Sequence, residues 1–268
     1  MTSPPIILTI AGFDPGSGAG VTADIKTIAA HGCYGVACIT ALTVQSTRGV
    51  LRLHAVTAAL IEETLSELAQ DVSFAGVHIG MLGSAEAAET VADFLSTYCP
   101  PNVVLDPVLR STSGAALLDP RGMSVLIERL LPLASVITPN LVEASIISGL
   151  AVIDRNQMLV AANQLHRMGA KAIVITGGHL DSPSDLLSFR DDSGLTQKFF
   201  DSQKIASNST HGTGCAFSTA LTCHLAEGKT LVEATKAAQE FVRSAISEAQ
   251  PIGKGTGPIN HCYRFRKG

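Results

Sequence analysis

Short apolar runs alternate with helical patterns along most of the chain, and this alternation limits the folds that its 268 residues can adopt. Most of the runs have the length of a buried strand, and stretches with helical spacing separate them. Strands are expected at 6–11, 34–44, 76–81, 103–105, 136–138 and 172–176. Helices are expected at 21–31, 60–68, 86–95, 123–131, 141–148, 156–168, 215–227 and 231–247. Such alternation predicts an α/β fold, a mostly parallel central sheet with helices on both faces.

The last strand signals differ from the others because no helix separates them. The runs 186–190 and 197–200 flank the turn Asp191-Asp192-Ser193-Gly194, which predicts a β-hairpin. No composition break or long linker divides the sequence, so we predict a single domain over 1–268.

Composition excludes several classes of partner. The chain is 46% hydrophobic and 16% charged, which suits a well-filled core. The net charge of −4 and the 4% aromatic content argue against nucleic-acid binding. No apolar run approaches the roughly 20 residues of a membrane span, and no signal peptide is evident. Because the six cysteines show no metal or disulfide spacing, we expect free thiols and a cytoplasmic protein.

The segment Asn208–Glu227 has the pattern of a loop that turns into a helix. Gly212 and Gly214 allow tight backbone geometry and a close approach of N–H groups to a ligand. The helical pattern runs from Cys215 to a stop at Gly228, and the free N–H groups at such a helix start bind phosphate. A thiol there is expected to have a lowered pKa, which makes Cys215 a candidate base. The alternative is an ordinary helix start with a small buried cysteine.

A second glycine-rich turn, 12–20, follows the first expected strand and opens a βαβ unit. Its glycines at 16, 18 and 20 lack the GxGxxG spacing, and no Lys-Ser/Thr pair follows, so neither a dinucleotide fingerprint nor a Walker A loop is present. The alternative to a ligand-binding role is a flexible connector.

Polar residues gather just after the expected strands, at Gln45, Asp106, Asn140, Glu143 and Gly177-Gly178. The carboxyl ends of parallel strands line the ligand crevice of an open sheet. Two carboxylates there suit Mg²⁺, and together with an anion-binding helix start they indicate phosphoryl transfer. Each position has a plainer explanation. Asp106 precedes a proline as turn formers do, and Asn140 with Glu143 has the spacing of a helix capping box.

The chain closely resembles the hydroxymethylpyrimidine/phosphomethylpyrimidine kinases of thiamine biosynthesis, which belong to the ribokinase-like superfamily. The resemblance runs nearly end to end and rests on Leu8–Lys26, Ile39–Gln45, Ile79–Leu82, Asp106–Val108, Ser113–Gly114, Thr138–Ala144, Gly177–His179, Thr210–Cys215 and Gly253–Pro258. The cysteine that ends the Thr210–Cys215 motif is informative, because sugar kinases of the superfamily normally carry Asp there.

The resemblance implies a role for each matched position. The catalytic positions would be Cys215 as base, with an anion hole formed by Gly212, Thr213 and Gly214. The pyrimidine pocket would include Gly12, Asp24, Val44 and Gln45. Phosphates or nucleotide would lie against Asp106, Asn140, Thr176, Gly178, Gly212 and Gly214. The Mg²⁺ ion would be organised by Glu143 and Asp106.

The implied reaction is ATP-dependent phosphorylation of 4-amino-5-hydroxymethyl-2-methylpyrimidine and then of its monophosphate, by a homodimer. Two departures concern the phosphates: Thr112 and Thr176 stand where many members have lysine, and Arg110 is the nearest candidate substitute. The second phosphorylation, which brings two phosphate groups together, is therefore the step that these departures affect. The alternatives are a pyridoxal or pyridoxine kinase and a non-catalytic pyrimidine-binding protein.

Overall fold

A computed structural model describes residues 3–111, 114–192 and 194–265, and within them the chain forms one nine-stranded sheet in the order β3-β2-β1-β4-β5-β6-β7-β8-β9. The strands are β1 (Ile6–Phe13), β2 (Tyr34–Ser46), β3 (Gly49–Ala55), β4 (Gly76–Ile79), β5 (Val103–Leu105), β6 (Val136–Ile137), β7 (Ala172–Ile175), β8 (Ser184–Asp191) and β9 (Gly194–Asp201). The central strands β2, β1, β4, β5, β6 and β7 run parallel. The edges, β3 on one side and β8 with β9 on the other, pair antiparallel.

The helices connect these strands and cover the sheet. They are α1 (Gly20–Ala30), α2 (Ala58–Asp71), α3 (Ala85–Tyr98), α4 (Pro120–Val125), α5 (Leu131–Leu133), α6 (Leu141–Ser148), α7 (Arg155–Arg167), α8 (Thr213–Ala226) and α9 (Leu231–Ser247), with a π-helical turn at Leu126–Leu130 and a 3-10 turn at Tyr263–Phe265. None of the helices in the described ranges is long and apolar enough to cross a membrane.

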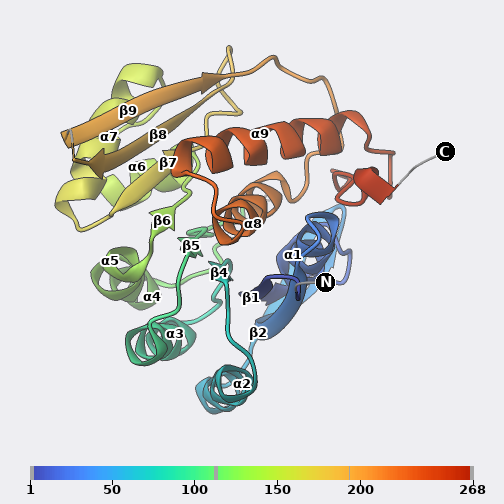
Figure 1. Ribbon diagram of the computed structural model, residues 1–268. Helices are drawn as coiled ribbons and strands as arrows, with labels where there is room; N and C mark the ends of the chain where they lie inside the picture. The colour runs from blue at the N-terminus through green and yellow to red at the C-terminus, as the bar shows by residue number, and fades with distance from the viewer. Residues whose placement is uncertain (1–2, 112–113, 193, 266–268) are drawn as a thin grey trace.

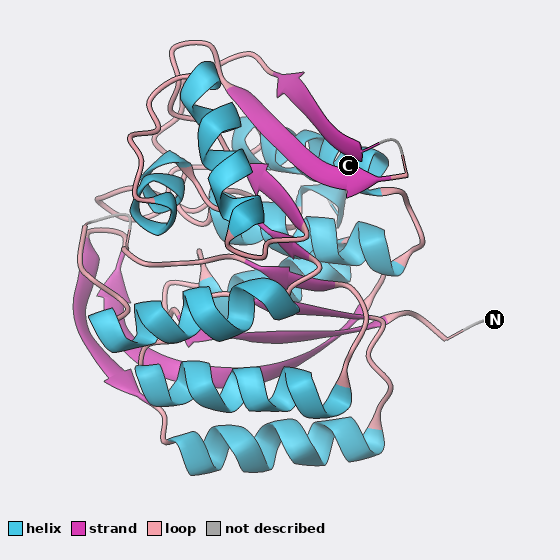
Figure 2. Ribbon diagram, turned by 90° about the vertical axis from the view of Figure 1, so that its left-hand side faces the viewer, coloured by secondary structure: helices cyan, strands magenta, loops and turns pink. Residues whose placement is uncertain are grey.

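Two layers of helices enclose the sheet, as Figures 1 and 2 show. Helices α2 to α7 pack on one face, and α1, α8 and α9 pack on the other. Successive side chains of a strand point to opposite faces of the sheet and so enter different cores. Val103 and Leu105 of β5 face the layer of α2 to α7, and Val104 between them faces the layer of α1, α8 and α9. The predicted α/β architecture, mostly parallel with helices on both faces, is confirmed.

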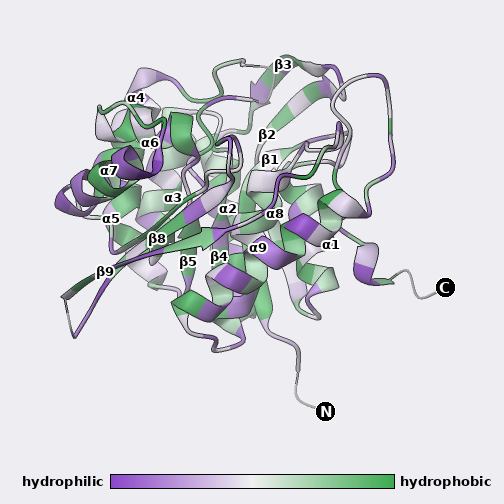
Figure 3. Ribbon diagram, turned by 90° about the horizontal axis from the view of Figure 1, so that it is seen from above, coloured by the Kyte–Doolittle hydropathy of each residue, from purple (hydrophilic) through white to green (hydrophobic). Residues whose placement is uncertain are grey.

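Helix α8 is more deeply buried than its apolar face predicted. Every residue from Ala216 to His224 is buried, because the helix lies between the sheet, α1 and α9. Helix α9 is amphipathic and closes this layer, with alternating hydrophobic and hydrophilic stretches visible in Figure 3. The buried core thus begins at Ala216, directly after the start of α8.

Two elements differ from the expectations. Strand β3 was not predicted, because its side chains are exposed or only half-buried and the buried-strand signal is absent. The helix predicted over 123–131 is α4, which continues as a π-helical turn before Pro132 in α5. Proline lacks the N–H that a regular α-helix would use at that point.

Candidate active site

The start of α8 is the centre of the candidate site. Gly212 is its N-cap in the left-handed region, with φ +84°, and no side chain caps the helix there. Gly214 in the first turn is exposed. Because the first N–H groups of a helix have no intrahelical partner, this end can receive an anion.

The two glycine-bearing loops of the sequence lie against each other at this point. A Cβ atom added to Gly212 would overlap the Gly18 carbonyl oxygen, and one added to Gly18 would overlap the His211 ring. Glycine is therefore required at both positions for the backbones to approach so closely.

The first loop is pinned by Asp14, which is buried inside it. Asp14 Oδ1 accepts from the Gly16 N–H at 2.8 Å, and Oδ2 accepts from the N–H groups of Gly18 at 3.2 Å and Ala19 at 3.1 Å. Asp14 Oδ2 also lies 2.9 Å from His211 Nε2 in the second loop. Burial raises the pKa of Asp14, but hydrogen bonds from His211 and the loop amides outweigh it, and the net pKa is lowered. The flexible-connector alternative for this loop is wrong.

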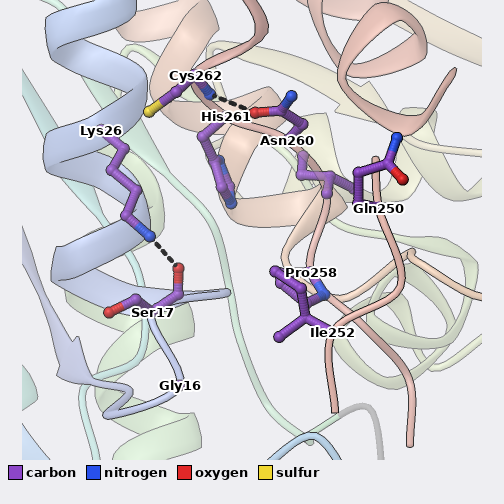
Figure 4. Close-up of a pocket in the computed structure, with 10 residues that line it drawn as sticks. Gly16, Ser17, Lys26, Gln250, Ile252, Pro258, Asn260, His261 and Cys262 are labelled. Carbon is purple, nitrogen blue, oxygen red and sulfur yellow. Dashed lines mark hydrogen bonds between the residues drawn. The ribbon is translucent and has the colours of Figure 1, made fainter. Parts of the chain in front are cut away.

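A pocket of about 200 Å³ lies behind the first loop. In Figure 4, Lys26 reaches the Ser17 carbonyl oxygen, with its Nζ at 2.8 Å. His261 braces the same loop, with Nε2 at 3.2 Å from the Gly18 carbonyl oxygen and Nδ1 at 3.1 Å from Thr27 Oγ1. No predicted site residue lines this pocket, so it supports the loop and is not the candidate active site.

Cys215 lies where the starts of α8 and α1 converge. The Gly20 N–H and the Asp106 carboxyl group both interact with its sulfur. Burial raises the pKa of Cys215 well above its ordinary value, and the charges of Asp106, Asp24 and Glu143 raise it further. The predicted lowering of this pKa is wrong, because burial and nearby carboxylates outweigh the positive end of the helix.

Asp106 follows β5 and faces the same helix start. A Cβ atom added to Gly214 would lie 3.9 Å from Asp106 Oδ2, and Ser218 Oγ donates to the same oxygen at 3.3 Å. Burial raises the pKa of Asp106 to about 6, although His78 opposes that shift. The turn-former explanation does not account for this placement.

Asn140 and Glu143 form the capping box that their spacing predicts. Asn140 Oδ1 accepts from the N–H groups of Val142 at 2.9 Å and Glu143 at 3.0 Å, and Glu143 Oε2 accepts from the Asn140 N–H at 2.9 Å. Burial, and then the charge of Asp106, raise the pKa of Glu143 to about 8. The capping explanation is therefore confirmed, but it leaves an electrostatically unfavourable pair of buried carboxyl groups.

This pair fits a cation. Within the described ranges, no cluster of three or more His, Cys, Asp or Glu side chains could hold a metal ion alone. Magnesium commonly uses only one or two carboxylates and fills its shell with waters and substrate phosphates. A positive charge between Asp106 and Glu143 would relieve the repulsion that raises the pKa of Glu143.

The residues predicted for the pyrimidine pocket separate into two groups. Gly12 is buried against Met81, and Gln45 lies beside the second loop, with Nε2 at 3.3 Å from His211 Nε2. Gln45 Oε1 accepts from Thr43 Oγ1 at 3.1 Å. The side chain of Val44 is 48% exposed. Gly12 therefore lies against the first loop, where a Cβ atom added to Gly20 would overlap its carbonyl oxygen, and Gln45 lies beside the second.

Asp24 does not join them. It is 0% exposed, and its oxygens accept from Thr9 Oγ1 at 2.6 Å and Thr219 Oγ1 at 2.9 Å. His78 Nδ1 lies 3.3 Å from Asp24 Oδ2. Both oxygens are thus bonded in this structure, and the placement of Asp24 in the pyrimidine pocket stays a prediction.

Two of the predicted nucleotide positions, Thr176 and Gly178, lie after β7. Thr176 forms an isolated parallel bridge with Asn140, and its N–H donates to the Pro139 carbonyl oxygen at 2.9 Å. Gly178 is exposed, and a Cβ atom added there would meet no other atom within 4 Å. Thr176 is therefore next to the Asn140 end of the site, whereas Thr112 lies outside the described residues.

Sequence reasoning missed four residues that organise the site: Asp14, His78, His211 and Ser218. A signal existed for His78, which is a polar residue in the otherwise apolar strand β4. No comparable signal marks Ser218, because a serine in a helix has no distinguishing pattern.

Known proteins resemble the chain over nearly its full length. The phosphomethylpyrimidine kinase family matches residues 14–260. A hydroxymethylpyrimidine/phosphomethylpyrimidine kinase of Haemophilus influenzae is 44% identical over 260 residues, which cover 95% of this chain and 96% of that protein. The thiamine biosynthesis bifunctional protein of Geobacter sulfurreducens is 43% identical over 95% of this chain, and the chain spans only 52% of that longer protein.

A solved structure shares the fold. An ADP complex of pyridoxal kinase from Bacillus subtilis has a TM-score of 0.87 and 34% sequence identity, and the match covers 97% of this chain and 98% of that one. The fold is therefore ribokinase-like, and the chain belongs to the phosphomethylpyrimidine kinase family.

Proposed function

We propose that this kinase transfers the terminal phosphoryl group of ATP to the hydroxymethyl group of 4-amino-5-hydroxymethyl-2-methylpyrimidine, and then to the resulting monophosphate. The family match and the names of the close relatives support the substrate. The observation that carries the proposal is the convergence of Cys215 and Asp106 on the uncapped start of α8.

Each group at that point suits one part of an alcohol phosphorylation. The backbone N–H groups of Gly212, Thr213 and Gly214 would stabilise the transferring phosphoryl group, which carries negative charge throughout the reaction. Cys215 would accept the proton of the substrate hydroxyl. Its raised pKa means that it is protonated at rest and a strong base once ionised, so positive charge from the bound co-substrate complex is needed to favour the thiolate.

We assign ATP and Mg²⁺ to the side formed by Asp106, Asn140, Glu143, Thr176 and Gly178. The pyridoxal kinase that resembles this chain was solved with ADP, which supports a nucleotide. Asp106 and Glu143 would hold the ion, which when bound would neutralise phosphate charge.

The metal assignment is tested by Glu143→Gln, which keeps the shape and removes the charge. We expect the Mg²⁺ concentration for half-maximal rate to rise about 10- to 100-fold, the usual span for losing a metal-site group. A glutamine caps a helix about as well, so unchanged Mg²⁺ dependence would leave Glu143 with the capping role alone.

Pyridoxal is the second candidate substrate, because the similar Bacillus subtilis structure is a pyridoxal kinase. Gln45 favours the pyrimidine, since its amide offers one donor and one acceptor to an aminopyrimidine edge. A non-catalytic pyrimidine-binding protein would need no base and no metal-binding carboxylates. Turnover of ATP would exclude this alternative, and absence of turnover would support it.

The deciding experiment supplies Mg-ATP with the pyrimidine alcohol, its monophosphate or pyridoxal, and identifies products by mass. Phosphorylation of both pyrimidines, well above pyridoxal, is the expected result. Phosphorylation of pyridoxal alone would overturn the proposed substrate.

We also propose a cytoplasmic homodimer. The free state of all six cysteines supports a reducing compartment. Leu42 on β2 and Leu51 on β3 expose apolar side chains, with Leu51 81% exposed, and this edge of the sheet would suit a second copy. Light scattering on the purified protein measures the mass directly.

A further inference from the structure

The side-chain amide of Gln45 is held between two neighbours that come from different segments of the chain. On one side, His211 Nε2 lies 3.3 Å from Gln45 Nε2 and 2.9 Å from Asp14 Oδ2. On the other side, Thr43 Oγ1 lies 3.1 Å from Gln45 Oε1 and 3.0 Å from the Phe13 carbonyl oxygen. The side chains of His211 and Asp14 are only 15% and 5% exposed, so these contacts are largely shielded from water.

The contact with Asp14 decides which atom of the His211 ring carries a proton. Asp14 Oδ2 already accepts from the N–H groups of Gly18 and Ala19, so it has no proton to give to the histidine. A lone pair on His211 Nε2 would face this oxygen at 2.9 Å and be repelled by it. Nε2 therefore carries a proton, and this holds for both the neutral ring and the charged ring, because the charged ring is protonated at both nitrogens.

Two conflicts then arise at the Gln45 amide. A protonated His211 Nε2 cannot accept a hydrogen bond, yet it faces the amide nitrogen, which is also a donor. The hydroxyl of Thr43 has a single proton, yet it faces two acceptors, the Phe13 carbonyl oxygen and Gln45 Oε1.

A half-turn of the amide resolves both conflicts at once, because it exchanges the oxygen and the nitrogen. Gln45 Oε1 then accepts from His211 Nε2–H, which it shares with Asp14. Gln45 Nε2 donates to Thr43 Oγ1, and the hydroxyl proton of Thr43 is free for Phe13. The hydrogen bonds of these neighbours therefore favour one orientation of the amide over the other.

We propose that His211, held by Asp14, is a positioning residue that sets substrate specificity by fixing the Gln45 amide with its oxygen toward His211 and its nitrogen toward Thr43. One N–H and one lone pair of the amide remain for the substrate. The inference rests on the proposed function, because it takes the aminopyrimidine edge as the partner of Gln45.

A fixed amide distinguishes two pyrimidines of nearly the same shape. The 4-amino compound presents a ring nitrogen acceptor beside an amino donor. Its 4-oxo analogue, in the form protonated at the adjacent ring nitrogen, presents a ring N–H donor beside a carbonyl acceptor. An amide that turns freely pairs with either edge, whereas a fixed amide pairs with only one of them. The measured quantity is therefore the selectivity ratio, kcat/KM for the amino alcohol divided by kcat/KM for the oxo alcohol.

The test compares His211→Met with His211→Gln, two side chains of similar length of which only glutamine has an N–H. We expect the wild-type protein to favour the amino alcohol and the ratio to fall about 3- to 10-fold in His211→Met, the effect of one net hydrogen bond. His211→Gln should restore most of the ratio. A merely structural role would lower activity on both alcohols alike and leave the ratio unchanged. An unchanged ratio in His211→Met, or equal ratios in the two variants, overturns the proposal.

Thr43→Val tests the other end of the amide and decides the matter if the His211 variants fold poorly. It keeps the shape of the side chain and removes the acceptor for Gln45 Nε2–H, so the selectivity ratio should fall here too. A ratio equal to that of the wild-type protein in Thr43→Val would also overturn the proposal. Chemical unfolding of every variant separates loss of folded protein from loss of selectivity.

A double-mutant cycle and a matched control isolate the route through Gln45. In a Gln45→Leu background, His211→Met should change the ratio no further, and additive losses would contradict the route. The control is His224, whose Nδ1 lies 3.1 Å from Glu227 Oε2 at the other end of α8. His224→Met should keep the wild-type ratio.

The wild-type protein is assayed first with Mg-ATP and the amino alcohol. Absence of product overturns the proposed substrate. Product from the amino alcohol, together with an unchanged ratio in the variants, overturns only the positioning role of His211, so the two failures are distinguished.

Discussion

The two glycine-bearing loops look alike in sequence but have opposite properties in the structure. Each precedes a helix, α1 or α8, and each packs against the other through glycine. In the first loop, Asp14 accepts the N–H groups of Gly16, Gly18 and Ala19. In the second, no side chain caps α8, and Gly214 is exposed.

The comparison shows that glycine content alone does not make a phosphate site. In the first loop the chain supplies its own carboxylate, so the amides are already satisfied and the loop is a support. In the second loop no side chain occupies the N–H groups of the helix start, and the proposed cation would neutralise the nearby carboxylates. What decides between support and site is whether an internal anion occupies the amides.

The largest expected effect concerns the start of α8, which no side chain caps. Cys215→Ala should lower phosphorylation of the pyrimidine alcohol by roughly 10²- to 10⁴-fold, the span of a positioned base. Cys223→Ala, in the same helix but buried away from the site, should keep its turnover. Initial rates at saturating substrates measure both, and equal rates for wild type and Cys215→Ala would remove Cys215 from the mechanism.

The same residue predicts a pH dependence. Since the pKa of Cys215 is raised, the rate of the first step should increase with pH in the alkaline range until the thiolate dominates. Cys215→Asp introduces a group that ionises at lower pH, so the rise should move toward acid. A pH–rate profile that is the same for both proteins would contradict the assignment.

A matched glycine pair tests the comparison most directly. Gly18→Ala would force a methyl group into the His211 ring, which should reduce the free energy of unfolding by about 1–3 kcal/mol. Gly214→Ala finds its nearest atom at 3.9 Å and should fold normally, yet its methyl group would crowd the bound phosphoryl group and slow turnover about 10- to 100-fold. Urea unfolding and kcat measure the two effects. Loss of stability in both variants, with equal turnover, would break the distinction.

The support behind the first loop predicts a loss of stability in acid. Burial lowers the pKa of His261 to about 4, whereas an unfolded histidine titrates near 6.5. Between these pH values the unfolded chain binds the extra proton, so stability is full above about 6.5 and falls as the pH decreases toward 4. At pH 5 the free energy of unfolding has decreased by about 2 kcal/mol relative to neutral pH.

The variant His261→Gln isolates this effect. Asp106 and Glu143, with pKa values raised to about 6 and about 8, act in the opposite sense and favour the folded state at low pH. Only the difference between the two proteins is therefore diagnostic: the decrease in unfolding free energy from pH 7.5 to 5 should be smaller in His261→Gln. Parallel pH curves would show that His261 is not the titrating group.

The smallest expected effect concerns the second phosphorylation. A phosphate monoester needs no base but must approach ATP against like charge, and exposed Arg110 follows the Asp106 strand end. Arg110→Ala should slow the second step about 2- to 5-fold, because an exposed charge contributes ~1 kcal/mol or less. The first step should change less. Arg129→Ala, an exposed arginine paired with Asp93, is the control, and equal effects on both steps would remove Arg110 from this role.

Local patterns in the sequence determined the framework of this protein. Apolar periodicity predicted the parallel strands and their covering helices, since burial of alternate residues depends on near neighbours in the chain. The Asn140–Glu143 capping box and the helix stop at Gly228 also follow from residues a few positions apart. Strand β3 escaped prediction because pairing with β2 defines it more than its own burial does.

Only the tertiary structure decided the chemistry of the site. The carboxylates that raise the pKa of Cys215 are at positions 24, 106 and 143, far apart in the chain. Asp24 became a buried partner of His78 because two strands and two helices enclose it. Likewise, the fold brings Asp14 of the first loop against His211 of the second, and so places the carboxylate on the N–H groups of the first loop. Desolvation and charge act through space. The pKa values and exposure of these residues therefore depend on tertiary neighbours that the sequence alone does not identify.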